Sequence, residues 1–377
     1  MHSYMSYLLW AIALIAVLVI VALLFNRESI IRAQGQPPIG DRLSVNWYHG
    51  AENLQPVIDV FTEQTGISVE VIDSYDLYNS DVVLISDFGT LLHAKRNGYL
   101  SYLRNAVRDR VVPAEYRDRD GMWYGVVLRA RGVVYAPDRV NGQHLQGWED
   151  LAHERWRGRL ALRQSDNVYN RSMVAMMVKT WGPERTSRWI RGIVDNATDG
   201  IDHRYLGDTS NVVRIAEGEA DLAFVNTYYL GYMLHAGFKS ESPDAGRKVQ
   251  VRWFNDDFGT PMNVTGVGIN PGTEFRWEAE KLVDFLLSEQ GQRLLSEHTY
   301  KYPVRSDVEP SSWLQQFGEF PRHEIDLNDL EPYYGQAIRL MEANGWRRIS
   351  DDKWPVAEAQ SRQRKRPVNP VLYPEPK

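Results

Sequence analysis

The 377-residue sequence contains no cysteine. This absence excludes disulfide bonds, thiolate metal sites, cysteine nucleophiles and an acylated lipoprotein cysteine. The chain also lacks a G-x-x-x-x-G-K-[ST] phosphate loop, a G-x-S-x-G nucleophile turn and an H-E-x-x-H metalloprotease helix. Its nine histidines are dispersed, without the spacing of a zinc site. No nucleophile with a base and no open metal site is indicated, so an enzyme is the least expected class of protein.

The chain also has no excess of basic residues over acidic ones. The formal net charge is -6 at pH 7 and the isoelectric point is near 5.9. A nucleic-acid-binding domain normally carries a basic stripe, so nucleic acid is not an expected partner. The composition, 43% hydrophobic and 24% charged, is that of a folded globular protein, and the length allows two domains or lobes.

One stretch near the N-terminus lacks charge altogether. Tyr7–Phe25 is an apolar run of 19 residues, close to the roughly 20 that cross a bilayer. It has no basic start and no small-residue exit, so it predicts a retained anchor over residues 1–28 rather than a cleaved signal peptide. Arg27 and Arg32 would place the following side in the cytosol by the positive-inside rule, and a buried core helix is the alternative. Residues 29–42 predict a linker.

From Leu43 onward, short apolar runs alternate with amphipathic stretches. "LSVNWY", "ISVEVI" and "SDVVLIS" predict strands, and "NLQPVIDVFTEQTG" and "GTLLHAKRNGYL" predict helices. This alternation indicates an α/β fold with mostly parallel sheets. Further on, "WYGVVLRARGVVYAPDRV" predicts two short strands around Gly125 and Gly132, and a helix is expected to end at Gly182. The charged, proline-rich residues 348–377 predict a disordered tail.

Two adjacent tyrosines stand at a position where ligands often bind. "DLAFV" predicts a strand, and Tyr228–Tyr229 would open the helix that follows it. In open α/β sheets, ligands bind where strands lead into helices. A phenolate is a hard anionic oxygen donor suited to Fe(III), and the ion would drive the phenol to lose its proton. Ordinary packing is the alternative. The second pair, Tyr333–Tyr334, lies in an amphipathic stretch and is expected to be structural.

The segment around the first pair, "GEADLAFVNTYYLGYML", resembles the signature of the ferric-ion-binding periplasmic proteins of bacterial ABC iron importers. The resemblance continues in order through "DVVLISDFGTLLHAKRNGYL", "WYGVVLRARGVVYAPDRV" and "GTPMNVTGVGIN", from about Leu43 to Trp346. It implies a two-lobed periplasmic-binding-protein fold of type II with the ion held in the cleft. The expected lobes are 43–135 with 262–310, and 136–261 with 311–347.

The resemblance also implies a set of site residues. Tyr228 and Tyr229 would bind Fe(III), and Tyr169 in "NVYNRS" would add a third phenolate. Arg129 and Arg131 of the "RAR" segment would lie near the cleft and neutralise ligand charge. Strand salt bridges are the alternative role for these arginines.

The first-lobe part of the implied site departs from the family. The loop "WYHGAEN" carries Glu52 where the family has a histidine, and His49 lies three residues earlier. Glu52 is still a hard oxygen donor, while plain solvation is the alternative for both residues. Asp87 corresponds to an acidic position of the family and would be a ligand or, preferably, a helix cap. The segment between "VEVI" and "DVVLIS" is shorter than in the family.

The function implied by this resemblance is Fe(III) binding for delivery to an ABC permease. A synergistic anion such as carbonate or citrate would complete the metal shell. The protein is expected to be a monomer, with a single-pass anchor in the bacterial inner membrane and a soluble domain in the periplasm. Two alternatives stay open: a degenerate binding domain used for interaction, assembly or sensing, and a binder of another small ligand.

Overall fold

A computed structural model describes residues 42–48, 50–76, 79–198, 207–235 and 244–346. The anchor expected over residues 1–28, nearly all of the linker 29–42, the tail 348–377 and His49 lie outside the described residues. Within the described ranges, no helix is both long and apolar enough to cross a membrane. The compact unit begins at Leu43.

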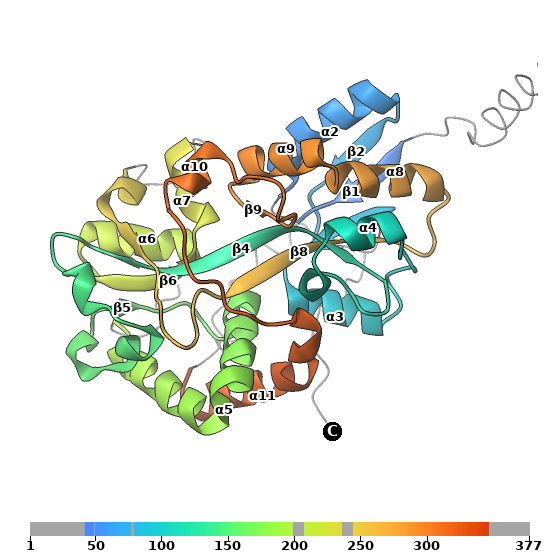
Figure 1. Cartoon of the computed structure of the whole chain (residues 1–377). Helices are drawn as coiled ribbons and strands as arrows, with labels where there is room; N and C mark the ends of the chain where they lie inside the picture. Colours follow the sequence, from blue (N-terminus) through green and yellow to red (C-terminus); the bar gives the residue numbers. More distant parts are fainter. Residues whose placement is uncertain (1–41, 49, 77–78, 199–206, 236–243, 347–377) are drawn as a thin grey trace, which may run out of the picture. The chain divides into compact units, whose positions relative to one another are not determined.

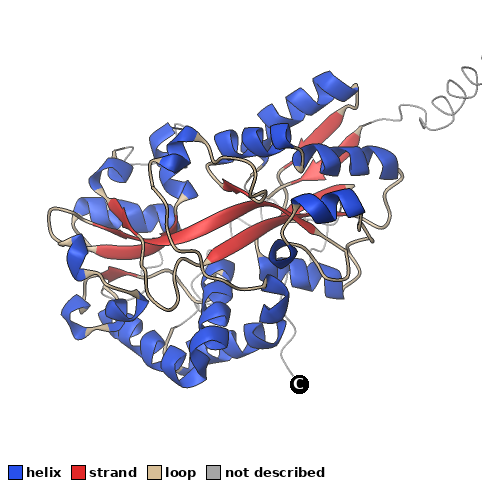
Figure 2. Ribbon diagram, in the orientation of Figure 1, coloured by secondary structure: helices blue, strands red, loops and turns tan. Residues whose placement is uncertain are grey.

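The strands are connected through hydrogen bonds in the order β2-β1-β3-β8-β4-β6-β5, and β7 and β9 also pair with β4. Helices cover both sides of these strands (Figures 1 and 2). The strand bounds are β1 (Leu43–Asn46), β2 (Val69–Ile72), β3 (Val82–Ile85), β4 (Tyr124–Tyr135), β5 (Leu160–Ala161), β6 (Leu222–Asn226), β7 (Gln250–Arg252), β8 (Met262–Ile269) and β9 (Tyr302–Pro303).

Most of the helices lie between strands along the chain, singly or in pairs. Their bounds are α2 (Ala51–Thr65), α3 (Phe88–Arg96), α4 (Ala106–Val111), α5 (Val168–Asn196), α6 (Asp208–Glu217), α7 (Tyr228–His235), α8 (Arg276–Leu286), α9 (Glu289–Thr299), α10 (Ser312–Gln315) and α11 (Glu331–Ala343). Short 3-10 helices lie at η1 (Ala114–Tyr116), η2 (Gly142–His144), η3 (Trp148–Ala152), η4 (Glu154–Trp156), η5 (Ala245–Lys248) and η6 (Leu327–Leu330).

Strand β4 contributes to both halves of the sheet. Its first part pairs with β8 and β9, and its last five residues pair with β6. The prediction of two short strands around Gly125 and Gly132 is therefore wrong, because both glycines lie inside one 12-residue strand. A Cβ at Gly125 would lie 2.7 Å from Tyr116 O, and one at Gly132 would lie 2.8 Å from the Trp253 ring. These glycines permit close approach rather than ending a strand.

The prediction of mostly parallel sheets is also wrong. β1 pairs in parallel with β2 and β3, and β5 pairs in parallel with β6. The pairings of β3 with β8 and of β4 with β6, β7, β8 and β9 are antiparallel. The sheets are mixed because the two long strands β4 and β8 run in opposite directions beside each other.

Local sequence patterns account for most helix positions. The buried side chains of α2 are Leu54, Val57, Ile58 and Phe61, which recur at helical spacing, and Gly66 ends the helix in the left-handed conformation. The predicted stop at Gly182 is confirmed as a break inside α5, where Gly182 has φ 79° and Pro183 follows. Beyond this break, Trp189 packs with Phe224 and Trp346 in the core of the second half.

Candidate metal-binding site

Tyr228 and Tyr229 lie where β6 leads into α7, as the sequence predicts. The backbone N–H of Thr227 donates to Ala130 O at 3.0 Å, which ties this junction to the middle of β4. The two tyrosine rings are stacked, with centroids 4.2 Å apart. Tyr228 is buried and Tyr229 is half-buried. Two phenols are therefore held side by side at a strand end, beside β4, the longest of the described strands.

Tyr169 joins this pair from the first turn of α5. Asn167 caps that helix by accepting a hydrogen bond from the Asn170 backbone N–H. The charge of Tyr169 acts on both Tyr228 and Tyr229, and is the largest contribution after burial to the pKa of each. The structure thus brings the three predicted phenols into one electrostatically coupled cluster.

The environment of the pair favours neutral phenols. Burial, and then the charges of Tyr169 and Tyr229, raise the pKa of Tyr228 well above its ordinary value, and Arg129 opposes this shift. Burial and the charges of Tyr169 and Asp208 also raise the pKa of Tyr229, and Arg163 opposes it. At neutral pH these phenols carry their protons, so a cation that binds phenolates must displace protons.

The two arginines of β4 make different contacts. The guanidinium of Arg131 pairs with Asp208 at 2.9 Å and donates to Asn170 Oδ1 at 2.8 Å. Asp208 also accepts from the Asn226 backbone N–H at 2.8 Å and pairs with Arg163 at 3.2 Å. Burial opposes ionisation of Asp208, but Arg131 and Arg163 hold its pKa below the usual range. Arg131 therefore braces the end of β6, just before the tyrosine pair.

Arg129 has more unused hydrogen-bond donors than Arg131 and could therefore bind a ligand. It is 2% exposed, and its Nη2 donates to Val264 O at 3.0 Å. Its Nε and Nη1 are buried without a hydrogen-bond partner among the described residues. The guanidinium carbon lies 4.6 Å from the centroid of the Tyr169 ring. Arg129 is thus a buried cation beside the phenols with two donors that an anion could use.

Lys301 is a second buried cation at the cluster, and sequence reasoning missed it. It is 4% exposed, and its Nζ lies 4.2 Å from the centroid of the Trp47 ring and 4.8 Å from that of Tyr228. Burial, followed by the charge of Arg129, lowers the pKa of Lys301 well below its usual range. The available signal was a lone lysine between two tyrosines in "TYKYPV".

Asp87 is the N-cap of α3, in agreement with the preferred alternative to a ligand role. Its Oδ1 accepts from the Gly89 backbone N–H at 2.7 Å. Its Oδ2 accepts from Ser172 of α5 and from Asn263 of β8, both at 2.8 Å. Burial raises the pKa of Asp87, although Arg129 and these hydrogen bonds act in the opposite direction. The carboxylate joins three elements and is already occupied by donors.

Glu52 is not joined to the tyrosines by any contact among the described residues. It lies exposed in the first turn of α2. No group of three His, Asp or Glu residues in the described ranges could hold a metal ion. The candidate site therefore depends on the phenols of Tyr169, Tyr228 and Tyr229.

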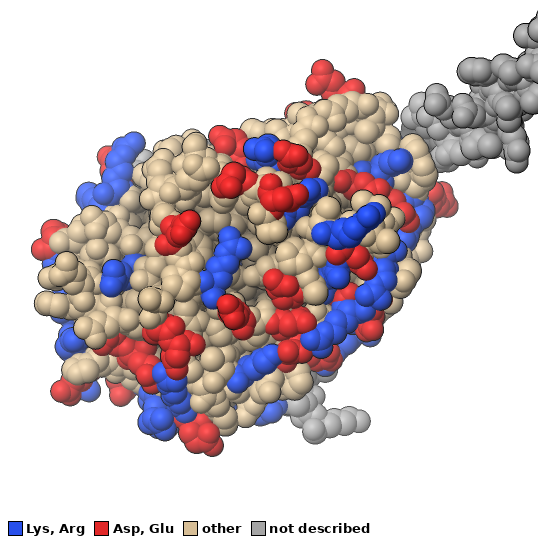
Figure 3. Space-filling model, viewed as in Figure 1, with Lys and Arg blue, Asp and Glu red and all other residues tan. Residues whose placement is uncertain are grey.

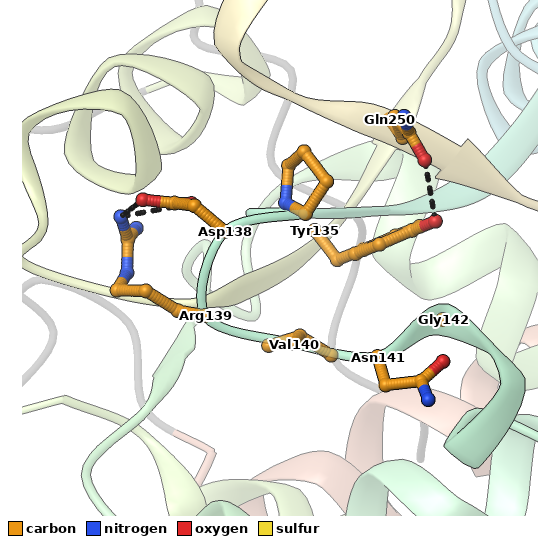
Figure 4. Close-up of a pocket in the computed structure, with 8 residues that line it drawn as sticks. Tyr135, Asp138, Arg139, Val140, Asn141, Gly142 and Gln250 are labelled. Carbon is orange, nitrogen blue, oxygen red and sulfur yellow. Dashed lines mark hydrogen bonds and ion pairs between the residues drawn. The ribbon is translucent and has the colours of Figure 1, made fainter.

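An open pocket of about 450 Å³ lies elsewhere on the surface (Figure 4). There the Tyr135 hydroxyl hydrogen-bonds to Gln250 Oε1 at 2.7 Å, and Arg139 pairs with Asp138 at 3.1 Å. The pocket is lined by Tyr135, Pro137, Asp138, Arg139, Val140, Asn141, Gly142 and Gln250. None of the predicted site residues lines this pocket, so we do not assign it to the candidate site.

Sequence comparisons identify a matching family model and related proteins. The family model of the bacterial extracellular solute-binding proteins matches residues 77–318. Iron uptake protein A1 of Synechocystis sp. is 34% identical over 305 residues, which cover 76% of this chain and 82% of that relative.

Solved structures show the same fold. A Trichodesmium protein in complex with iron and citrate has a TM-score of 0.73 at 27% identity, covering 81% of this chain and 100% of that chain. Apo ferric ion-binding protein A of Pasteurella haemolytica has a TM-score of 0.74 at 26% identity, covering 83% and 100%. The predicted two-lobed periplasmic-binding-protein fold with α/β content is therefore confirmed.

Proposed function

Because the chain belongs to the family of bacterial extracellular solute-binding proteins, we propose that it binds Fe(III) through the phenolates of Tyr169, Tyr228 and Tyr229. The observation that carries this proposal is the stacked pair of Tyr228 and Tyr229 at the end of β6 together with Tyr169 of α5, whose ring lies against the buried Arg129 and whose charge acts on both phenols of the pair. Phenolate oxygens are hard donors that suit a hard trivalent cation. The similarity to an iron uptake protein and to a ferric ion-binding protein supports the same ligand.

Charge counting supports an anion as a companion to the ion. Three phenolates neutralise Fe(III), and the buried guanidinium of Arg129 then remains beside the complex as excess positive charge, to which Lys301 adds only while it is protonated. A small anion such as carbonate or citrate, bound to the free donors of Arg129, would balance this charge. The citrate in the Trichodesmium complex supports this choice. Glu52 has the weakest support as an oxygen donor, since it lies exposed on α2.

The transport role belongs to the same proposal. The protein would hold iron between two lobes, 43–135 with 262–310 and 136–261 with 311–347, and deliver it as a monomer to an ABC permease. The apolar run Tyr7–Phe25 would anchor the chain in the inner membrane, with the soluble domain in the periplasm. This arrangement would keep the binding domain close to its permease.

An iron titration tests the ligand assignment. Adding ferric citrate to the purified chain should produce a visible tyrosinate-to-iron charge-transfer band. Tyr228→Phe combined with Tyr229→Phe should abolish the band. The matched control is Tyr333→Phe with Tyr334→Phe, which alters the adjacent tyrosine pair on α11 and should leave the band unchanged. Equal behaviour of the two double variants, or no band in the unaltered chain, would refute iron binding by these tyrosines.

A second candidate is a binding-protein fold used for interaction or sensing with little metal affinity. The exposed position of Glu52 favours it, because the described contacts bring no oxygen donor from the loop before α2 to the phenols. If the titration yields no band while the chain still captures partners independently of iron, this second function replaces the first.

A further inference from the structure

Exposed hydrophobic side chains are concentrated at one edge of the compact unit. Five large hydrophobic side chains are exposed among the described residues, and one of them, Tyr75, lies against Tyr48, just before α2, with ring centroids 3.8 Å apart. The other four form what we call the aromatic edge: Tyr99 (37% exposed), Tyr102 (57%), Val107 (58%) and Trp277 (43%). Such clustering marks an interaction surface, whereas single exposed hydrophobic residues would need no explanation.

The elements that carry the aromatic edge are bonded to one another. Arg108 of α4 pairs with Asp284 of α8 at 2.7 Å. Arg276, which precedes Trp277 at the start of α8, donates to Tyr102 O at 2.6 Å. The segment after α3, α4 and the start of α8 therefore form one continuous side of the fold, as the positions of α4 and α8 in Figure 1 show.

The chain enters the compact unit at this same edge. Asp81 accepts hydrogen bonds from the Ser44 backbone at the start of β1 (2.8 Å) and from Thr273, just before α8 (2.7 Å). The Ser101 backbone N–H donates to Ile269 O at 2.8 Å, which brings the segment of Tyr102 to the same end of the sheet. Leu43, the first residue of the compact unit, therefore lies at the same end of the sheet as the aromatic edge.

The side chains at the aromatic edge suit a lipid–water interface. Tyrosine and tryptophan are enriched at the headgroup level of membranes, and Arg and Lys stems lie along apolar surface with their charges in water. Lys281 Nζ lies 5.3 Å from the centroid of the Trp277 ring. Two of the acidic neighbours are paired, Glu280 with Arg276 and Asp284 with Arg108, whereas Glu278, next to Trp277, makes no ion pair among the described residues. Figure 3 shows Lys and Arg interspersed with Asp and Glu over this side rather than a field of negative charge.

We propose that the aromatic edge rests on the surface of the lipid bilayer and orients the binding domain above it. This inference rests on the proposed anchor. Residues 29–42 number 14, and a linker of that length with random-coil statistics would have a root-mean-square span of about 20 Å. The start of β1 would therefore stay near the headgroups, where even weak contacts of Tyr102 and Trp277 become intramolecular events.

Site-directed spin labelling of the full chain tests this contact. The chain has no cysteine, so Tyr102→Cys and Trp277→Cys each give a single site for a nitroxide. In phosphatidylethanolamine–phosphatidylglycerol vesicles, both labels should lose collisions with a water-soluble nickel relaxant and gain collisions with oxygen. A label at Arg247→Cys is the control, because Arg247 is 68% exposed on η5, away from this edge, and should not change.

Flotation of the vesicles separates the two proposals. If the chain floats but the labels at 102 and 277 behave like the label at 247, the membrane contact is overturned while the anchor stands. If the chain does not float, the anchor and the contact are both overturned. Protection of the labels without lipid would also overturn the contact, because it would indicate association between copies of the chain.

A third label keeps the result independent of the two aromatic sites. A nitroxide at Val107→Cys should show the same shift on vesicles, and Tyr102→Ser with Trp277→Ser should abolish that shift. Both aromatic side chains are exposed, so circular dichroism of the double variant should match that of the parent chain. An unchanged shift at position 107 would show that the aromatic side chains do not make the contact.

Discussion

The two sides of the candidate site carry opposite chemistry. α5 and α7 present the phenols of Tyr169, Tyr228 and Tyr229, whereas β4 and the residue before β9 present the buried cations of Arg129 and Lys301. The first side offers ligands for a hard cation, and the second offers partners for an anion. Substitutions on the two sides should therefore alter separate properties, metal affinity on the phenol side and anion dependence on the cation side.

Among the substitutions that test this difference between the two sides, Tyr169→Phe is expected to have the largest effect, a loss of iron affinity. This change removes one proposed phenolate, while leaving the stacked pair of Tyr228 and Tyr229 in place. We expect the iron affinity to fall by more than about 100-fold, because loss of a direct ligand should exceed the 10–100-fold typical of outer-shell changes. Competition with a ferric chelator measures the affinity. A loss below about tenfold would show that Tyr169 is not a ligand.

The next effect contrasts the two arginines of β4. Arg131→Gln should destabilise the fold by about 3–5 kcal/mol, because it removes one of the two cationic partners that the described residues provide for the buried charge of Asp208, leaving Arg163. Arg129→Gln should cost much less stability, since Arg129 makes one hydrogen bond from Nη2, but should weaken the dependence of iron binding on citrate. Urea unfolding and anion titrations measure these quantities. Equal unfolding free energies of the two variants would contradict this assignment.

The position of Tyr228 and Tyr229 at a strand end could be predicted because the pair lies in a local pattern, whereas Tyr169 was assigned only through the family resemblance. A buried strand followed by capping residues and a helix start can be recognised within a dozen residues, and Tyr228 opens α7 as predicted. Lys301 could not be assigned in this way, since its environment is created by Trp47 and Tyr228, which are distant in sequence. The separate contacts of Arg129 and Arg131 likewise depend on Val264 and Asp208.

The fold was predictable to a similar extent. Helices and strands with clear periodicity are placed correctly, whereas the prediction of two short strands around Gly125 and Gly132 is wrong. Glycine breaks a pattern in the sequence, but here it makes room for Val264 and Trp253 against an unbroken strand. Strand direction also escaped prediction, because the antiparallel pairing of β4 and β8 joins residues far apart in the chain.

A further test counts the protons that the tyrosines release when iron binds. Burial keeps the pKa values of Tyr228 and Tyr229 above their ordinary range, so both phenols are protonated at neutral pH. Iron loading should release at least two protons, and the apparent affinity should then rise by about 100-fold per pH unit below those pKa values. An indicator dye in weak buffer counts the released protons. Iron binding without proton release would exclude these two tyrosines as phenolate ligands.

The smallest effect is expected on the cation side, from Lys301→Met. Methionine can fill the space between Trp47 and Tyr228 without placing a charge there, so the metal-free protein should gain about 1–4 kcal/mol of stability. The pKa of Lys301 is lower in the folded protein, so the unfolded chain binds its proton more tightly and the wild type loses stability as pH falls below about 10.4. The advantage of Lys301→Met should therefore grow as pH is lowered from that value. Urea unfolding at several pH values measures it, and a variant that is less stable than the wild type at neutral pH would show that the ammonium stabilises the tyrosine cluster instead.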